Sequence, residues 1–450
     1  MRRYLTLQST LALFAALVLA LLWAVPAQSG GPPKGDPIAD ADKKLPQDDD
    51  YVVHEWGTFT SFSGSDGVSL DFRTTATADL PTFVLDRTKQ AFISERRDIA
   101  YRTGRGEKGT IISKQRMETP VTYFYSDRER LVDVTVEFPR GLLTEFYPPV
   151  RQFGPAYKKD QSETPLENSW LRWGKIRLLP ADKAIDPKTG VDPYIRKITA
   201  GEDEHYGYAR DVDATTVQIT DPAMLATYRE RFLFYRGVGN FDLPVSLRSN
   251  GGGHFTMTHS GKTPLRYAFL MHVDADGHTI RFARYEHVLG SMEMTLPSQA
   301  DTLDHLAAQV TQCLMLDGLY EKEARAMVRT WRSSWFGEPG TRVLYSLPRE
   351  NTDAVLPLRL DPAPKELVRV MIGRLEALTV EDERSIGELV AQLGNADPAV
   401  REQKTAELRR LGRFAEPALA RAAQLSEDPE IRLRAQLLTR EILAGKPGAK

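Results

Sequence analysis

The stretch "DDDYVVHEWGTFTSF", residues 48–62, decides where and how the fold begins. Its three aspartates end a polar leader. Tyr51 then opens a run of β-branched and aromatic residues around a central glycine, a composition typical of a strand. Alternate side chains of a strand point to opposite faces, so His54 and Trp56 should share one face while Glu55 lies on the other.

The pair His54–Glu55 invites comparison with the zinc-protease pattern HExxH. Position 58 is Thr58 and not histidine, and the pattern requires a helix to bring both imidazoles to one side. We therefore interpret His54 first as a hydrogen-bonded structural residue and second as a candidate catalytic residue.

Residues 1–27 have the pattern of a signal peptide. Arg2 and Arg3 precede the fifteen apolar residues "LALFAALVLALLWAV", and small residues follow up to Ala27. Because a bilayer span needs about 20 apolar residues, we expect cleavage and export to the periplasm or beyond, with an uncleaved membrane anchor as the alternative. Residues 28–50 are rich in Gly, Pro and Asp and predict a disordered linker, with order beginning at Tyr51.

The charge balance disfavours binding to nucleic acid. The 450 residues hold 59 Lys and Arg against 61 Asp and Glu, a net charge of −2, which offers no general field for a polyanion.

Cys313 is the single cysteine, so an internal disulfide is impossible. It shares the apolar side of a predicted helix with Leu306 and Val310, which indicates a buried, inert thiol.

Residues 51–296 predict a β-rich domain. "VTYFYS" (121–126), "LVDVTVEFP" (131–139) and "GLLTEFYP" (141–148) are strand-like segments separated by turn residues. "DADG" (274–277) should close a hairpin. We expect a mostly antiparallel, sandwich-like arrangement, interrupted by a helix that Asp221 caps in "DPAMLATYRERF".

Residues 297–380 predict a helical pair with strands, packed on the β domain. Apolar residues recur at helical spacing over 301–316 and 320–335. The strand-like segments "RVLYSL" and "AVLPLRL" follow. The next segment, "PAPKELVRVMIGRLEAL" (362–378), receives no assignment.

Residues 381–445 contain a repeat, and residues 446–450 form a tail. "DPAVR" at 397–401 recurs as "DPEIR" at 428–432, an offset of 31 residues, and each Asp should cap a helix. This spacing predicts a HEAT-like α-helical segment of fewer than the roughly three units that a free solenoid needs, so it should dock on the rest or form a small bundle. The predicted fold class is α+β.

Several segments together carry a resemblance: "VHEWGTFTSF", "METPVTYFYS", "GLLTEFYPP", "LRWGKIRLLP", "FLFYRGVGNFDLPV" and "WRSSWFGEPGTRVLYSLP". Over roughly residues 51–375 the chain resembles a family of exported bacterial proteins of unknown function. The resemblance implies export and no particular activity, cofactor or catalytic residue. The tail is similar to HEAT-like repeats attached to many bacterial proteins, which implies a contact surface.

The candidate metal ligands are His254, His259, His272 and His287. An offset of five places His254 and His259 on opposite faces of a strand, so they could converge only through a bulge at the preceding three glycines. A divalent metal is thus an option, although we expect no cofactor. Glu118 is a second catalytic candidate, with pairing to Arg116 at a sheet edge as the favoured interpretation.

The leading hypothesis is an exported binding or scaffolding protein whose HEAT-like tail contacts a protein partner. One alternative is a periplasmic metal-assisted hydrolase that uses a cluster of His and Glu residues. Another is a carbohydrate-binding protein with exposed tryptophans, although the sequence favours core positions for most of them: Trp56, Trp170, Trp173, Trp331 and Trp335.

Overall fold

The structure is a computed structural model, and it describes residues 47–73, 84–86, 112–155, 166–188, 192, 195, 207–221 and 226–443. The expected signal peptide lies outside these residues, as does the linker up to residue 46. Within them, no helix is both long and apolar enough to cross a membrane. The first strand, β1 (Gln47–Ser63), starts before Tyr51, so the prediction that order begins at Tyr51 is wrong. Gln47 and Asp48 pair with a neighbouring strand through their backbones, a form of pairing that polar side chains do not prevent.

The chain is an α+β protein with mostly antiparallel sheets. The largest is a ten-stranded sheet, whose strands are, in order, β17 (Ile280–Val288), β16 (Leu265–Val273), β19 (Gly340–Leu347), β21 (Ala363–Ala377), β1, β6 (Gln115–Ser126), β13 (Leu233–Gly239), β8 (Gly141–Tyr147) and β4 (Leu85–Asp86), with β2 (Ser69–Leu70) beside β1. A six-stranded sheet consists of β12 (Ala226–Glu230), β11 (Thr216–Asp221), β10 (Ser169–Leu179), β7 (Arg130–Phe138) and β20 (Leu358–Asp361), with β9 (Gln152–Gly154) beside β10. Smaller sheets are formed by β14 (Val245–Gly251), β15 (His254–His259) and β18 (Gly290–Thr295), and by β3 (Phe72–Arg73) with β5 (Ile112–Ser113).

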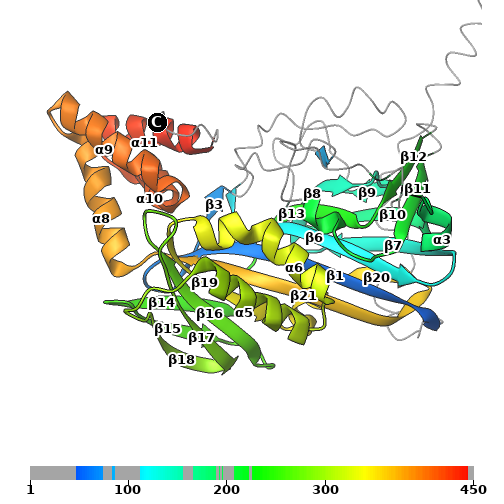
Figure 1. The fold of residues 1–450 in the computed structure, drawn as a ribbon. Helices are drawn as coiled ribbons and strands as arrows, with labels where there is room; N and C mark the ends of the chain where they lie inside the picture. Colours follow the sequence, from blue (N-terminus) through cyan, green and yellow to red (C-terminus); the bar gives the residue numbers. More distant parts are fainter. Residues whose placement is uncertain are drawn as a thin grey trace, which may run out of the picture.

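The central pair of the ten-stranded sheet is β1 and β21, which run parallel and lie side by side through the middle of Figure 1. On its other side β1 pairs with β6 in antiparallel orientation. β21 is the segment that the sequence left unassigned. Residues 369–377 are buried on both faces, so they lack the polar alternation that marks a half-exposed strand. β19 and β21 are internal strands of the main sheet. The expectation that the strands of residues 297–380 only pack on the β domain is therefore wrong.

One face of this sheet is covered by the expected helical pair, α5 (Leu303–Leu316) and α6 (Glu321–Arg332), drawn in yellow-green and yellow in Figure 1. Trp56, Phe269 and Val370 of the strands pack with Met327 of α6 in one buried cluster. Cys313 lies in this cluster and is fully buried, as predicted. Burial raises the pKa of its thiol to about 11, which keeps the thiol protonated at neutral pH.

The opposite face shares a core with the smaller sheets. Phe59 of β1 and Phe124 of β6 belong to the same buried cluster as Val134 of β7, Trp173 of β10 and Met257 of β15. The predicted alternation in β7 is confirmed, because its valines are buried and Asp133, Thr135 and Glu137 are only half-buried. The hairpin closed by "DADG" is confirmed as β16 and β17, with Val273 opposite Ile280.

The helix predicted to start at Asp221 is wrong. Asp221 ends β11, and Ala226–Glu230 forms β12, which pairs with β11 from Val217↔Glu230 to Asp221↔Ala226. The Asp-Pro start signal is local, whereas pairing with a neighbouring strand is a tertiary interaction that overrides such propensities. The short helix α7 (Arg349–Val355) likewise replaces part of the strand expected over "AVLPLRL".

The C-terminal segment consists of α8 (Val380–Ala391), α9 (Pro398–Leu411), α10 (Glu416–Leu425) and α11 (Pro429–Leu443), which lie beside the main sheet in Figure 1. Both expected caps are present: Asp397 accepts a hydrogen bond from the Ala399 amide, and Asp428 accepts one from the Glu430 amide. The arginine of each repeat also makes equivalent contacts. Arg401 donates to the carbonyls of residues 395 and 396, and Arg432 donates to those of residues 426 and 427.

The close approach of strands at Gly373 provides a test of the central sheet. A Cβ atom at this position of β21 would overlap with the buried ring of Tyr345 on β19. Gly373→Ala should therefore destabilise the protein by about 1–3 kcal/mol through overpacking, measured as the midpoint of urea unfolding. Gly387→Ala in α8 is the matched control, because no atom of the described residues lies within 4 Å of the place that its added methyl group would take, and alanine favours a helix. Equal midpoints for the two variants would contradict this packing.

Candidate functional site

His54 lies in a buried cluster between β1, β6 and the start of α6. Its Nδ1 is 2.7 Å from Oε2 of Glu323, and the Tyr125 hydroxyl donates to Oε1 of the same carboxylate at 2.7 Å. The rings of Tyr125 and Tyr320 flank the imidazole, with centroid separations of 5.4 and 4.4 Å. Burial and then the Glu323 carboxylate raise the pKa of the Tyr125 hydroxyl far above its usual range, so it stays a hydrogen-bond donor.

Glu55 lies on the other face of β1, as predicted. Its Oε2 accepts a hydrogen bond from Nε of Arg369 at 2.7 Å, and its Oε1 accepts from the hydroxyls of Tyr235 at 2.5 Å and Thr122 at 3.2 Å. Burial lowers the pKa of the Arg369 guanidinium, but Glu55, Tyr235 and Asp353 together more than offset this, so the pKa lies above its ordinary value. Arg369 also donates to Asp353 of α7 at 2.8 Å.

These contacts give His54–Glu55 a structural role. An imidazole oriented by a carboxylate is also the arrangement of a general base. Here, however, His54 is only 1% exposed and two tyrosine rings pack on it. The pair instead joins α6 to one face of the sheet and Arg369 to the other. Sequence reasoning missed Glu323 and Arg369, and the only local signal was the capping-box spacing between Tyr320 and Glu323.

Glu118 pairs with Arg116, as expected, and accepts a hydrogen bond from Thr60. The expectation of a sheet edge is wrong. β6 is flanked by β1 and β13, and Glu118 is 2% exposed. The next residue, Thr119, adopts a φ of 43°, a left-handed conformation that a β-branched residue rarely takes. Its hydroxyl is buried and has no hydrogen-bond partner among the described residues.

The four candidate metal ligands do not come together. His254 is exposed near Thr295, whereas His259 is buried with its ring nitrogens 3.0 and 2.8 Å from the carbonyl oxygens of residues 244 and 263. His272 contacts Thr341, and burial lowers its pKa. His287 is exposed on β17. Within the part of the chain that the structure describes, no group of three His, Cys, Asp or Glu side chains could hold a metal ion.

The three glycines before His254 belong to the turn between β14 and β15, and the register of these strands shifts just before it, between Ser249 and Gly251. Gly251, Gly252 and Gly253 all have positive φ angles, which glycine adopts without strain. The turn brings the Gly252 amide to 3.3 Å from Glu381 of α8. It thus places the three-stranded sheet against the C-terminal helices and does not unite His254 with His259.

The five tryptophans considered for a carbohydrate groove are all buried, with exposed fractions from 0% to 7%. The interpretation as core residues is confirmed, and a binding surface made from these tryptophans is excluded.

Sequence reasoning also missed a buried ion cluster, in which Arg342 and Arg374 both contact Glu376, and each of the three is fully buried.

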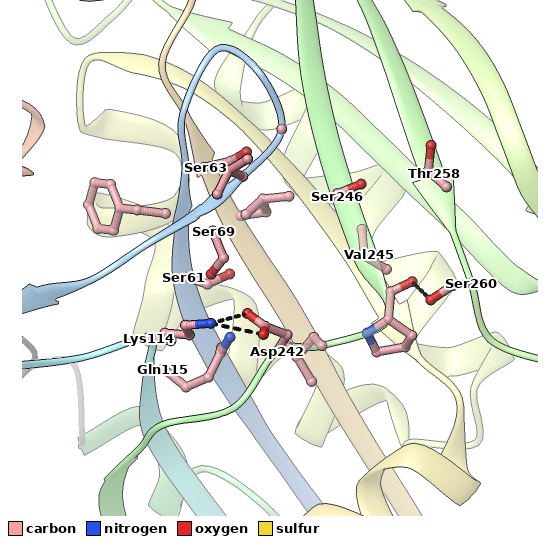
Figure 2. Close-up of a pocket in the computed structure, with 16 residues that line it drawn as sticks. Ser61, Ser63, Ser69, Lys114, Gln115, Asp242, Val245, Ser246, Thr258 and Ser260 are labelled. Carbon is pink, nitrogen blue, oxygen red and sulfur yellow. Dashed lines mark hydrogen bonds and ion pairs between the residues drawn. The ribbon is translucent and has the colours of Figure 1, made fainter.

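A pocket of about 290 Å³ lies where the end of β1 meets the three-stranded sheet, and Figure 2 shows it at close range. Lys114 and Asp242 stand at one side, with the Lys114 Nζ at 3.1 and 2.9 Å from the two carboxylate oxygens. Hydroxyl groups from four segments line the rest: Ser61, Ser63, Ser69, Ser246, Thr258 and Ser260. None of these residues was a sequence candidate, because isolated serines on strands carry no motif.

Two polar groups of this pocket lack hydrogen-bond partners among the described residues. The hydroxyl of Ser61 makes no hydrogen bond there, and its oxygen is accessible from the pocket. Gln115 is 2% exposed; its amide nitrogen donates to the Phe241 carbonyl at 3.1 Å, but its Oε1 is buried without a donor. Buried polar groups are normally satisfied, so the Gln115 oxygen indicates a place where a ligand or water belongs. This pocket is the candidate functional site.

The two buried contacts of β1 lead to a stability prediction. Glu55→Gln leaves the buried Arg369 without its carboxylate, and removing one member of a buried ion pair costs about 3–5 kcal/mol. Glu323→Gln disturbs the buried hydrogen bonds with His54 and Tyr125, which costs about 1–3 kcal/mol. We expect both variants to unfold at clearly lower urea concentration, followed by tryptophan fluorescence. Glu321→Gln is the control, because its pair with Arg325 is exposed and should change stability by less than about 0.5 kcal/mol. If all three variants unfold together, the assigned role of His54–Glu55 is wrong.

Comparison of the chain with protein-family models and with curated proteins gives no match. The proposal for function therefore rests on the residues of the pocket and of the C-terminal helices. The resemblance noted from the sequence motifs remains a prediction.

Proposed function

We propose that this is an exported binding protein that takes a small polar ligand in the pocket of Figure 2 and contacts a protein partner through its C-terminal helices. The observation that carries the first part is the buried Oε1 of Gln115, which has no donor among the described residues, in a pocket lined by hydroxyl groups. Leaving such a group unsatisfied costs about 1–3 kcal/mol, and a bound molecule would remove this penalty.

The proposal keeps the finer architecture expected from the sequence. A sandwich-like body is supported by the core that the ten-stranded sheet shares with the six-stranded sheet. A HEAT-like segment is supported by the identical cap and arginine contacts at the 31-residue offset. Export is supported by the pattern of residues 1–27 and by the resemblance to exported proteins.

Exposed leucines support the second part. Leu433 and Leu437 lie one turn apart on α11 and are 53% and 48% exposed, and Leu425 at the end of α10 is 76% exposed. The opposite side of α11 is buried through Ala435 and Leu438. HEAT-like repeats bury their apolar surfaces against neighbouring elements. The exposed side of α11, with Leu433 and Leu437, is therefore available for contact with a partner.

The pocket is tested by filling it. Ser246 lines the pocket and is half-buried, and its hydroxyl makes no hydrogen bond among the described residues, so Ser246→Trp should fill the space without unfolding the protein. In saturation-transfer NMR with a library of small polar compounds, we expect binding to the wild-type protein that disappears in Ser246→Trp. Ser298→Trp, at an exposed position after β18 and outside the pocket, should retain it. Binding that survives in Ser246→Trp would remove the pocket from the proposal.

The helical surface is tested by crosslinking in the source cells. A photoreactive amino acid at position 437 should give one adduct of reproducible mass, because that side chain would lie in the interface. The same group at Leu131, an equally exposed leucine of β7, should give none. Adducts that are identical at both positions, or missing at 437, would contradict a partner surface on α11.

A further inference from the structure

We propose that the ligand of this pocket is a neutral polyhydroxylated molecule of about the size of one sugar ring. This inference rests on the function proposed above and names the ligand class. It draws on the charge of the pocket, the arrangement of its hydroxyl groups and its size.

The charge of the lining favours a neutral ligand. Among the described residues that line the pocket, only Lys114 and Asp242 are charged, and they form an ion pair with each other. A bound carboxylate or phosphate would have to compete with Asp242 for Lys114, and a bound ammonium would have to compete with Lys114 for Asp242. A ligand hydroxyl avoids this conflict, because it can accept a hydrogen bond from the ammonium and donate one to the carboxylate.

The distribution of hydroxyl groups favours several polar groups on the ligand. The hydroxyl groups of Ser61 (β1), Ser69 (β2), Ser246 (β14) and Thr258 (β15) have no hydrogen-bond partner among the described residues. Figure 2 shows Ser61 and Ser69 beside the Lys114–Asp242 pair, and Ser246 and Thr258 on the neighbouring sheet. A single polar group could not reach both sides, whereas a ring with hydroxyls around its rim could.

Gln115 adds a specific requirement. Its amide nitrogen is already bound to the Phe241 carbonyl, so its free Oε1 can only accept a hydrogen bond. The ligand must therefore include a donor, which excludes ethers and esters that have no hydroxyl or amine. Together with the ion pair, this requirement describes a molecule whose polar groups both donate and accept.

The size and the apolar part of the lining limit the ligand further. Pockets for drug-sized molecules enclose about 300–1,000 Å³, and this pocket of about 290 Å³ is at the lower limit. Leu243, Val245 and Leu375 supply apolar surface for the carbon skeleton. A polyol or a monosaccharide combines a small carbon skeleton with hydroxyls in several directions.

The experiment compares neutral polyols with charged analogues of the same size. D-glucose, D-mannose, D-galactose and myo-inositol are titrated into the purified full-length protein, followed by NMR, together with D-glucuronate, glucose 6-phosphate and D-glucosamine. We expect at least one neutral compound to bind, and its charged analogues to bind at least tenfold more weakly. Ser246→Trp should abolish this binding, and Ser298→Trp should retain it.

Two further variants test the hydroxyl contacts. Ser61→Ala removes one hydrogen bond and should weaken the neutral ligand about three- to tenfold. Thr258→Ala, at an exposed position where misfolding is not a concern, should weaken it to a similar extent. Ser298→Ala, outside the pocket, should leave the affinity unchanged.

The results separate the two proposals. Charged analogues that bind as well as or better than the neutral compounds overturn the ligand class and leave the pocket function standing. The ligand class is also overturned if library compounds bind in the pocket while none of the polyols does. If no compound of either set binds in a manner sensitive to Ser246→Trp, the pocket function fails and the ligand class fails with it.

Discussion

The carboxylate of Glu55 meets the guanidinium of Arg369 inside the protein, and the arrangement of the main sheet depends on this contact. Both groups belong to the parallel pair β1–β21, and both are almost completely buried. Charges in the interior are tolerated only when they are paired and hydrogen-bonded. Glu55 therefore requires Arg369, Tyr235 and Thr122 at once, and this requirement fixes β21 on one side of β1 and β6 and β13 on the other.

His54 applies the same constraint on the opposite face. Its contact with Glu323 can form only when α6 lies on the sheet with its first turn over β1. A slip of β1 by one residue would exchange the two faces and would leave Glu55 beneath the helix without its arginine. His54 and Glu55 thus specify the register of β1, whose other buried side chains are mostly apolar.

Much of the fold could be predicted from local pattern. The alternation in β7, the Asp-Gly hairpin, the spacing of α5 and α6 and the caps of α9 and α11 are all properties of short segments. β21 and β12 could not be predicted in this way. The first lacks alternation because both its faces are buried, and the second follows an Asp-Pro pair that resembles the start of a helix. In both cases the deciding interaction is with another strand, which the local pattern does not reveal.

The pocket was beyond prediction for a related reason. Ser61, Lys114, Asp242 and Ser246 come from four separate segments, and each of them alone is an ordinary surface or strand residue. The divergence of His54 and Glu55 required only the two-residue period of a strand and was predicted correctly. Their partners required knowledge of which distant segments meet, which a single sequence without a motif does not contain.

The pairing of β1 with β21 also has a consequence for the order of events during synthesis. Glu55 and Arg369 are 314 positions apart, so β1 gains its parallel neighbour only after most of the chain has left the ribosome. Closing so long a loop is slow, and the strand must remain unpaired on that side until then. If the chain is exported, as we propose, this delay is an advantage, because the central sheet cannot close before the C-terminal part of the body is available.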